Sequence, residues 1–195
     1  MAAHFLFLHW PDRGELGPRV STMHFAPAEW SPADVAPLKL AGAWAISSND
    51  PRVGGVSALT LDDGRFIAVT DSGVVLQFGR PSARPTKVLV NELPGGPARP
   101  GFKVNRDSEA LAADPLGRGW WVAFETRNQL WLYDAGFERV LGRVDFGDAR
   151  WRFNQGIEGL ASGKDGIILF PEAGNNMLRW TGRSAPSFKL ERPLG

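Results

Sequence analysis

The sequence lacks cysteine and has almost no excess charge, and each absence removes classes of function. Without cysteine the chain forms no disulfide, has no thiol nucleophile and cannot bind zinc through thiolates. Its 22 Lys and Arg residues balance 21 Asp and Glu residues, which gives a formal net charge of +1. This near neutrality provides no bulk attraction to nucleic acid or to an anionic membrane surface.

Long hydrophobic runs are also missing. No stretch approaches the roughly 20 apolar residues of a transmembrane helix. Residues 5–10 are apolar but shorter than a signal-peptide core of roughly 7–15 residues, so no signal peptide is evident. The sequence has no P-loop and no dinucleotide-binding glycine motif, and Ser57 does not lie in a hydrolase nucleophile elbow.

The residues that are abundant favour an all-β protein. The chain contains 23 Gly, 15 Pro, 12 Phe and 8 Trp, and no segment repeats its apolar residues at helical spacing. We predict that residues 1–37 form an irregular, proline-rich arm with one strand near residues 5–8. Residues 38–48 are predicted to be a strand that enters the first unit of a repeated β domain over residues 38–195.

A strand–turn–strand motif occurs three times in that domain. The first strands begin in the similar segments 55–59, 107–111 and 156–160. Second strands, each ending in a carboxylate, are predicted at 66–71, 120–125 and 167–172. Third strands follow at 74–78, 129–133 and 176–180, and fourth strands at 86–90, 139–146 and 187–190. A repeat of about fifty residues made of strands and turns predicts the blades of a β-propeller.

Three repeats are fewer than the four to eight blades of a closed propeller. The chain is therefore part of a longer protein, or it self-associates through its open blade edges, or a fourth atypical blade closes it. We favour the first alternative and predict a partial propeller of about three to four blades.

Acidic residues recur at the same place in each repeat. If the first two strands form an antiparallel hairpin, three pairs lie opposite each other: Ser57 with Asp71, Glu109 with Glu125, and Glu158 with Glu172. All three pairs then lie at the same end of their hairpins. If the first strands line a central channel, Ser57, Glu109 and Glu158 converge on its mouth, and the second-strand acids lie one strand behind them. Clustered carboxylates need protons, basic partners or a hard cation, and calcium prefers six to eight such oxygen ligands. The alternative is that these acids only form ion pairs with Arg106, Arg127 and Arg152.

These motifs resemble the bacterial "esterase-like activity of phytase" family, whose members contain a phytase-like β-propeller. The matching segments are residues 40–73, 106–115, 121–134 and 154–161, so the chain is similar to the N-terminal portion of that family. The resemblance implies phosphoesterase-like activity carried by Asp71, Glu109, Glu125, Glu158 and Glu172. It also implies a periplasmic or secreted protein.

Our leading hypothesis is a hydrolase that cleaves a phosphomonoester or phosphodiester with the help of Ca²⁺. Asp71, Glu109 and Glu158 are expected to bind the metal, and Glu109, Glu125, Glu158 and Glu172 to form the catalytic set. Lys103, Arg106 and Arg152 are expected to bind a small anionic substrate. One alternative is a non-catalytic β-propeller binding module with a structural calcium, and a further one is a lactonase-like or carboxylesterase propeller.

Overall fold

The computed structural model describes residues 17–29, 37, 40–98, 100, 106–146, 156–172 and 177–180, and the backbone of residues 189–191. This part of the chain forms fourteen β-strands and no helix. Accordingly, no described helix could cross a membrane.

Twelve of the strands form three four-stranded antiparallel units, which we call blades 1, 2 and 3; blades 2 and 3 are separate sheets, and blade 1 is part of a six-stranded sheet. Blade 1 contains β3 (Val56–Asp62), β4 (Arg65–Thr70), β5 (Val74–Phe78) and β6 (Thr86–Glu92). Blade 2 contains β7 (Ser108–Ala113), β8 (Gly119–Phe124), β9 (Gln129–Asp134) and β10 (Val140–Asp145). Blade 3 contains β11 (Ile157–Gly163), β12 (Gly166–Pro171), β13 (Met177–Trp180) and β14 (Lys189–Glu191).

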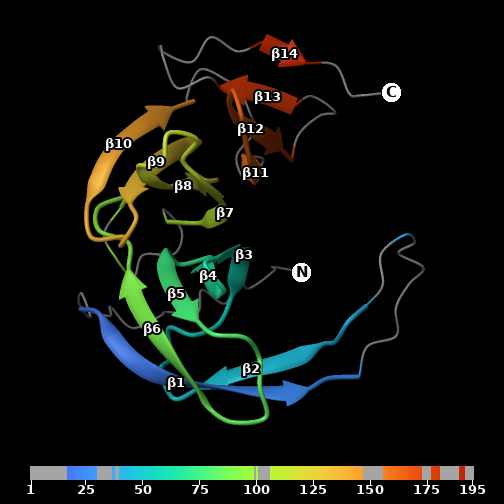
Figure 1. Cartoon of the computed structure of the whole chain (residues 1–195). Coiled ribbons are helices and arrows are strands. Elements are labelled where there is room, and N and C mark those ends of the chain that lie inside the picture. Colours follow the sequence, from blue (N-terminus) through green and yellow to red (C-terminus); the bar gives the residue numbers. More distant parts are fainter. Residues whose placement is uncertain are drawn as a thin grey trace, which may run out of the picture.

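The blades fan out along an arc, and their first strands β3, β7 and β11 lie beside one another on its inner side (Figure 1). Within each blade, strands pair in chain order from the inner edge outwards. This arrangement confirms the predicted all-β, propeller-like fold.

The strands of blade 2 are buried on both faces because a blade packs on each side. Trp120 and Val122 of β8 belong to the apolar core shared with blade 1. Trp121 and Ala123 point the other way, into the core shared with blade 3. There, Trp121 meets Trp180 edge to face, with the ring centroids 4.7 Å apart. The tryptophans of β8 therefore serve inter-blade packing.

Two further strands extend the outer edge of blade 1. β1 (Arg19–Pro27) pairs with β6, and β2 (Trp44–Ser48) pairs with β1, so the sheet order is β2-β1-β6-β5-β4-β3. The prediction of irregular structure was wrong at β1, and β2 joins the outer edge instead of entering the first repeat. The expected strand near residues 5–8 lies outside the described residues.

The reason for the missed strand lies in its two ends. Pro18 precedes β1 and Pro27 is its last residue, where a missing N–H interrupts little of the ladder. Between them, Met23 and Phe25 are buried against the face of blade 1. The proline content of residues 1–37 therefore gave the wrong prediction for β1, because the burial of this strand depends on residues of blade 1 that are distant in the sequence.

Candidate functional site

A β-bulge interrupts the first strand of every blade at the same position. In blade 2, Ser108 pairs with Phe124 and Ala110 pairs with Ala123, so Glu109 is the extra residue between them. Ser57 of β3 and Glu158 of β11 are the extra residues of the corresponding bulges. Bulges re-aim side chains and are frequent beside functional sites. They also shift the hairpin register by one residue from the predicted pairing.

The acid that ends each second strand is held by an equivalent backbone hydrogen bond. Its N–H donates to the carbonyl oxygen of the residue two positions before the bulge residue. The three bonds are Asp71 to Gly55 at 2.8 Å, Glu125 to Asp107 at 2.8 Å, and Glu172 to Gly156 at 2.9 Å. The second-strand acids and the bulge residues therefore lie at the same end of their hairpins, as the sequence predicted.

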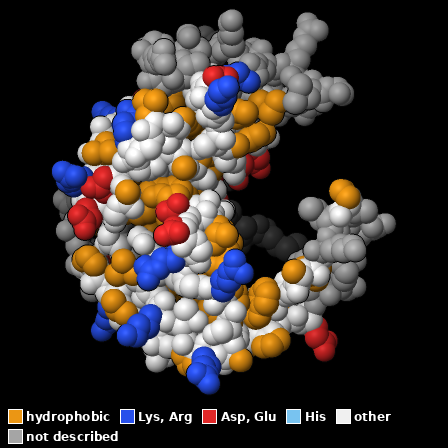
Figure 2. Space-filling view, viewed as in Figure 1, with side chains coloured by type: hydrophobic (Ala, Val, Ile, Leu, Met, Phe, Trp, Pro, Cys, Tyr) orange, Lys and Arg blue, Asp and Glu red, His pale blue; other side chains and the backbone are white. Residues whose placement is uncertain are grey.

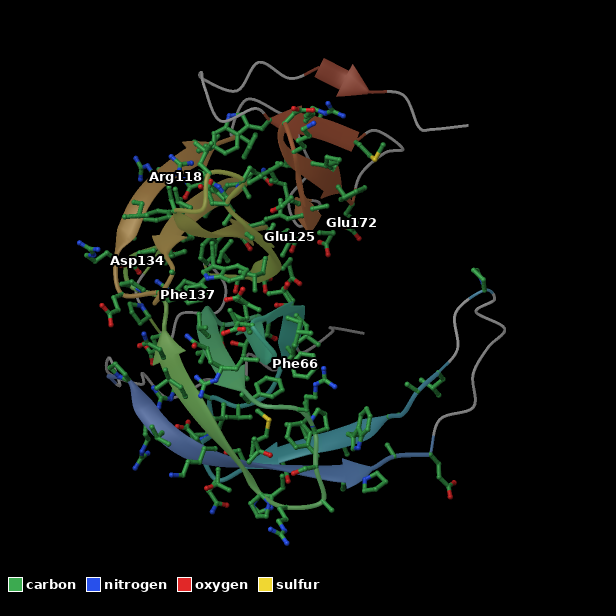
Figure 3. All side chains as sticks on the ribbon, in the orientation of Figure 1. Phe66, Arg118, Glu125, Asp134, Phe137 and Glu172 are labelled. Atoms are coloured by element: carbon green, nitrogen blue, oxygen red, sulfur yellow. The ribbon has the colours of Figure 1, made fainter. Side chains whose placement is uncertain are left out.

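These residues line one pocket with a volume of about 430 Å³ on the inner side of the arc. Figure 2 shows acidic side chains on the rim of the hollow that the blades partly enclose. Figure 3 shows Glu125 and Glu172 at the neighbouring ends of β8 and β12. The lining residues are Gly55, Val56, Ser57, Asp71, Asp107, Glu109, Glu125, Glu158 and Glu172. Six of these nine residues are carboxylates, and none of the described lining residues is Lys or Arg.

Five of the six carboxylates form two groups with a shared member. Oxygen atoms of Asp107, Glu109 and Glu125 lie within 4.8 Å of one another, and so do those of Glu125, Glu158 and Glu172. Glu125 is the shared and most enclosed residue, with 4% of its surface exposed. Asp71 lines the same pocket without joining either group.

The crowding of negative charge changes the protonation of two glutamates. Burial, the charge of Asp107 and a hydrogen bond with Asp107 raise the pKa of Glu109 to about 8. Burial and a hydrogen bond with Glu125 raise the pKa of Glu158 to about 7. In the absence of a cation, these two side chains therefore take up protons near neutral pH, which lowers the repulsion within the cluster.

Glycine leaves space for the acids at two of the three equivalent positions. A Cβ atom on Gly156 would lie 2.8 Å from both Cγ and the carbonyl oxygen of Glu125. A Cβ atom on Gly55 would lie 2.7 Å from a carboxylate oxygen of Asp71, and its φ of +59° also favours glycine. The first residues of these motifs thus allow the carboxylates to approach the backbone closely.

Hydrogen bonds from two serines link blades 1 and 2 beside the pocket. The hydroxyl of Ser108 donates to the carbonyl oxygen of Thr70 at 2.6 Å. The hydroxyl of Ser57 donates to the backbone carbonyl oxygen of Ser108. Ser57 also lies 3.2 Å from the carbonyl oxygen of Val69. Its hydroxyl proton is thus directed at the backbone, which makes Ser57 a structural residue rather than a nucleophile.

The prediction that Arg106 binds substrate was wrong. The side chain is fully buried, and its guanidinium donates to the carbonyl oxygens of Leu93 at 2.7 Å, Ala98 at 2.9 Å and Gly95. These bonds hold the loop that follows β6. The other two predicted substrate contacts, Lys103 and Arg152, lie outside the described residues.

Sequence reasoning did not select Asp107 as a site residue. The equivalent positions in the other two repeats are Gly55 and Gly156, so the repeat pattern gave no indication of an acid there. Its position directly before the strand that carries Glu109 is the feature that could have identified it.

The sequence model of the phytase-like family, described as "Esterase-like activity of phytase", matches residues 51–181. The chain belongs to the phytase-like family. The matched region includes all three hairpins and all six carboxylates of the pocket. No curated protein matches the chain.

Several solved structures are similar to the chain at low sequence identity. A Lactobacillus plantarum protein is 16% identical with a TM-score of 0.50, and the match covers 77% of this chain and 47% of that one. Glutaminyl cyclase from Myxococcus xanthus is 16% identical with a TM-score of 0.48, covering 71% and 50%. The Cps50 (Swd1) β-propeller domain of Myceliophteria thermophila is 12% identical with a TM-score of 0.41, covering 71% and 38%. The chain spans about half the length of the first two structures.

Proposed function

We propose that the acidic pocket binds Ca²⁺ and that this site serves the hydrolysis of a phosphate ester. The observation that supports the proposal is the convergence of six carboxylates in one pocket whose described lining contains no basic side chain. The carboxylates come from all three blades, and bulges at equivalent positions present Glu109 and Glu158.

The donor atoms fit calcium better than zinc. The pocket offers carboxylate and backbone oxygen atoms, and calcium takes six to eight such ligands in flexible geometry. Zinc prefers histidine nitrogen and cysteine sulfur, neither of which lines the described pocket. Glu109 and Glu158 would bind on either side of Glu125, with Asp107 and Glu172 as their respective neighbours.

A bound cation would neutralise charge on the phosphoryl oxygens and make a water molecule more nucleophilic. The protein's own acids supply the proton transfers. Without a cation, the pKa values of Glu109 and Glu158 are raised to about 8 and 7, so Ca²⁺ binding to these carboxylates would displace their protons. A pocket carboxylate that does not bind the cation would then accept the proton of the attacking water. The N–H of Gly156 lies 3.4 Å from Oε1 of Glu125 and orients that carboxylate between the two groups.

The family description connects this pocket with esterase-like chemistry, and we extend it to a phosphomonoester or phosphodiester. An anionic substrate needs positive charge at an acidic pocket, which a cation would provide. Lys103 and Arg152 remain predicted contacts to that substrate. A periplasmic or secreted location agrees with calcium use, because extracellular calcium modules bind with a Kd of about 10⁻⁴–10⁻³ M.

The test is hydrolysis of p-nitrophenyl phosphate and bis(p-nitrophenyl) phosphate by the purified chain, with Ca²⁺ or with a chelator. We expect Ca²⁺-dependent turnover that Glu109→Gln removes while the melting temperature stays within a few degrees. Glu138→Gln, which changes an exposed glutamate outside the pocket, is the matched control and should keep full turnover. Turnover that is unchanged in Glu109→Gln would contradict the assignment.

One observation favours a second candidate, a non-catalytic module with a structural calcium. Ser57 is bonded to the backbone, and the described lining contains neither histidine nor a basic residue that could contact substrate. In that case Ca²⁺ would raise the melting temperature, whereas no ester would be hydrolysed. Adding a carboxyl ester and a lactone to the substrate panel also tests the lactonase-like and carboxylesterase alternatives.

A further inference from the structure

Each of the three blades has a leucine at the same position of its first strand. This leucine packs against a neighbouring blade in blades 2 and 3 but is exposed in blade 1. Leu111 of blade 2 is 8% exposed and lies in the core shared with blade 1. Leu160 of blade 3 packs against the core shared with blade 2. The equivalent Leu59 of blade 1 is 56% exposed. Leu59 therefore occupies a position that contacts the preceding blade in both other repeats.

The opposite end of the arc shows the complementary situation. Val69 of β4 is fully buried in the core between blades 1 and 2, and Ala123 of β8 is fully buried between blades 2 and 3. The equivalent residue of β12, Phe170, is 39% exposed. Ile168 lies two residues earlier and points to the same face. Blade 3 thus presents the type of surface on which a following blade packs.

Exposed apolar residues also lie on β2, the edge strand opposite β3 in the same six-stranded sheet. We call Trp44, Ile46, Leu59 and Leu61 the leading face, and Ile168 and Phe170 the trailing face. Leu59 and Leu61 pair with Ala68 and Phe66, while Ile46 and Trp44 pair with Phe25 and Pro27. Directly opposed residues of antiparallel strands share a face, and Ala68, Phe66 and Phe25 all belong to or contact one core cluster. The four residues of the leading face therefore lie on the same face of the six-stranded sheet, two on each of its edge strands.

The pictures agree with this placement. β1 and β2 extend away from the other strands of blade 1 (Figure 1). Hydrophobic side chains lie along the side of blade 1 that faces the hollow (Figure 2). All four residues of the leading face are at least 44% exposed, an unusual concentration of large apolar side chains on one surface.

We propose that two copies of this 195-residue chain associate head to tail, with the leading face of each copy on the trailing face of the other. Both halves of the contact occur on the same chain, so a second copy supplies what each end lacks. Two such contacts would close a ring of six blades, within the four to eight blades of known propellers. The net charge of +1 opposes such self-association little.

Sedimentation velocity at tens of micromolar protein tests this proposal. The wild-type chain should sediment at twice its 21.3 kDa mass, whereas Leu59→Arg and Phe170→Arg should each sediment as monomers. Val20→Arg is the matched control, because Val20 is 65% exposed on the opposite face of the same sheet. It should remain dimeric, and circular dichroism should show the same strand content in all four proteins.

Mixing the two monomeric variants separates head-to-tail contact from any other association. Leu59→Arg keeps an intact trailing face and Phe170→Arg keeps an intact leading face, so the mixture should form a heterodimer through one contact. A monomeric wild-type chain would overturn the proposal and would mean that further blades of a longer protein cover these faces. A Phe170→Arg dimer would also overturn it, since it would show contact between two leading faces.

Discussion

The backbone N–H of Gly156 in blade 3 lies 3.4 Å from Oε1 of Glu125 in blade 2. This contact links adjacent blades through the most buried acid of the pocket. Because Glu125 belongs to both groups of carboxylates, its position determines the distance between them. The packing of two blades and the geometry of the proposed cation site therefore depend on the same contact.

Gly156→Ala should separate the two blades at this point. The new Cβ would lie 2.8 Å from Cγ of Glu125, and relieving such overpacking costs about 1–3 kcal/mol. We expect a lower free energy of unfolding in urea and weaker calcium binding by calorimetry. Gly142→Ala is the control, since its Cβ would meet no atom within 4 Å. Equal behaviour of the two variants would show that the Gly156 contact is unimportant.

Glu125→Gln should weaken calcium binding about tenfold or more, because it removes one of the charges that set the affinity of a calcium site. The amide oxygen can still accept from the N–H of Gly156, so the fold should persist. Calorimetric titration of calcium measures the affinity, and Glu138→Gln provides the comparison. If Glu125→Gln binds calcium as tightly as the wild type, the cation lies elsewhere.

The raised pKa values predict how stability depends on pH in a chelator. Glu109 and Glu158 bind protons more tightly in the folded state than at their ordinary pKa of 4.5. Their contribution is complete below that value and is lost as pH rises through about 7 for Glu158 and about 8 for Glu109.

We therefore expect the melting temperature in a chelator to fall as pH rises from about 5 to about 9. The double variant Glu109→Gln/Glu158→Gln should show a flatter profile, and saturating Ca²⁺ should remove the decline by neutralising the cluster. A chelated wild-type protein whose melting temperature rises across this range would refute the protonation account.

Ser108→Ala should destabilise the contact between blades 1 and 2. The variant removes the 2.6 Å hydrogen bond to the carbonyl oxygen of Thr70, which keeps its 3.0 Å bond from the N–H of Gly73, so we expect a loss of about 0.5–1.5 kcal/mol. Urea unfolding measures the loss. Ser82→Ala removes an exposed hydroxyl and should change stability by less than about 0.5 kcal/mol. Similar losses in both variants would argue against a special role for Ser108.

Arg106→Lys should lower stability without affecting the cation site. Lysine cannot reproduce the forked donors that reach Leu93, Gly95 and Ala98, so we expect a loss of about 2–4 kcal/mol. Calcium affinity should stay unchanged, and the exposed Arg65→Lys should alter neither property. Unchanged stability together with weaker phosphate-ester binding would show that Arg106 contacts the substrate.

The sequence predicted the blades because their structure is local and repeated. The strand at Ser108–Ala113 and the positions of the other hairpins follow from short apolar segments between turns. β1 escaped prediction because Met23 and Phe25 become buried only through pairing with β6 and packing on blade 1. No sequence period records such a distant partner.

The convergence of Glu109 and Glu158 was predictable because equivalent positions of a propeller's first strands face the same centre. The β-bulges at these two residues were not predictable, because the alternation of apolar side chains in the sequence does not reveal an extra residue in a hairpin. Arg106 was misassigned because its partners are backbone carbonyls, which a pattern of charged side chains does not show.

The central claim is that the acidic pocket binds a divalent cation in the folded state. Thermal unfolding of the wild-type chain in Ca²⁺ and in a chelator tests it most directly. At a calcium concentration roughly 100-fold above Kd, binding adds about 2.7 kcal/mol, which corresponds to a rise of about 5 °C or more. We predict a cooperative transition with this rise in the wild type and a rise of about half that size or less in Glu125→Gln. A cooperative transition at the same temperature with and without calcium would contradict the claim.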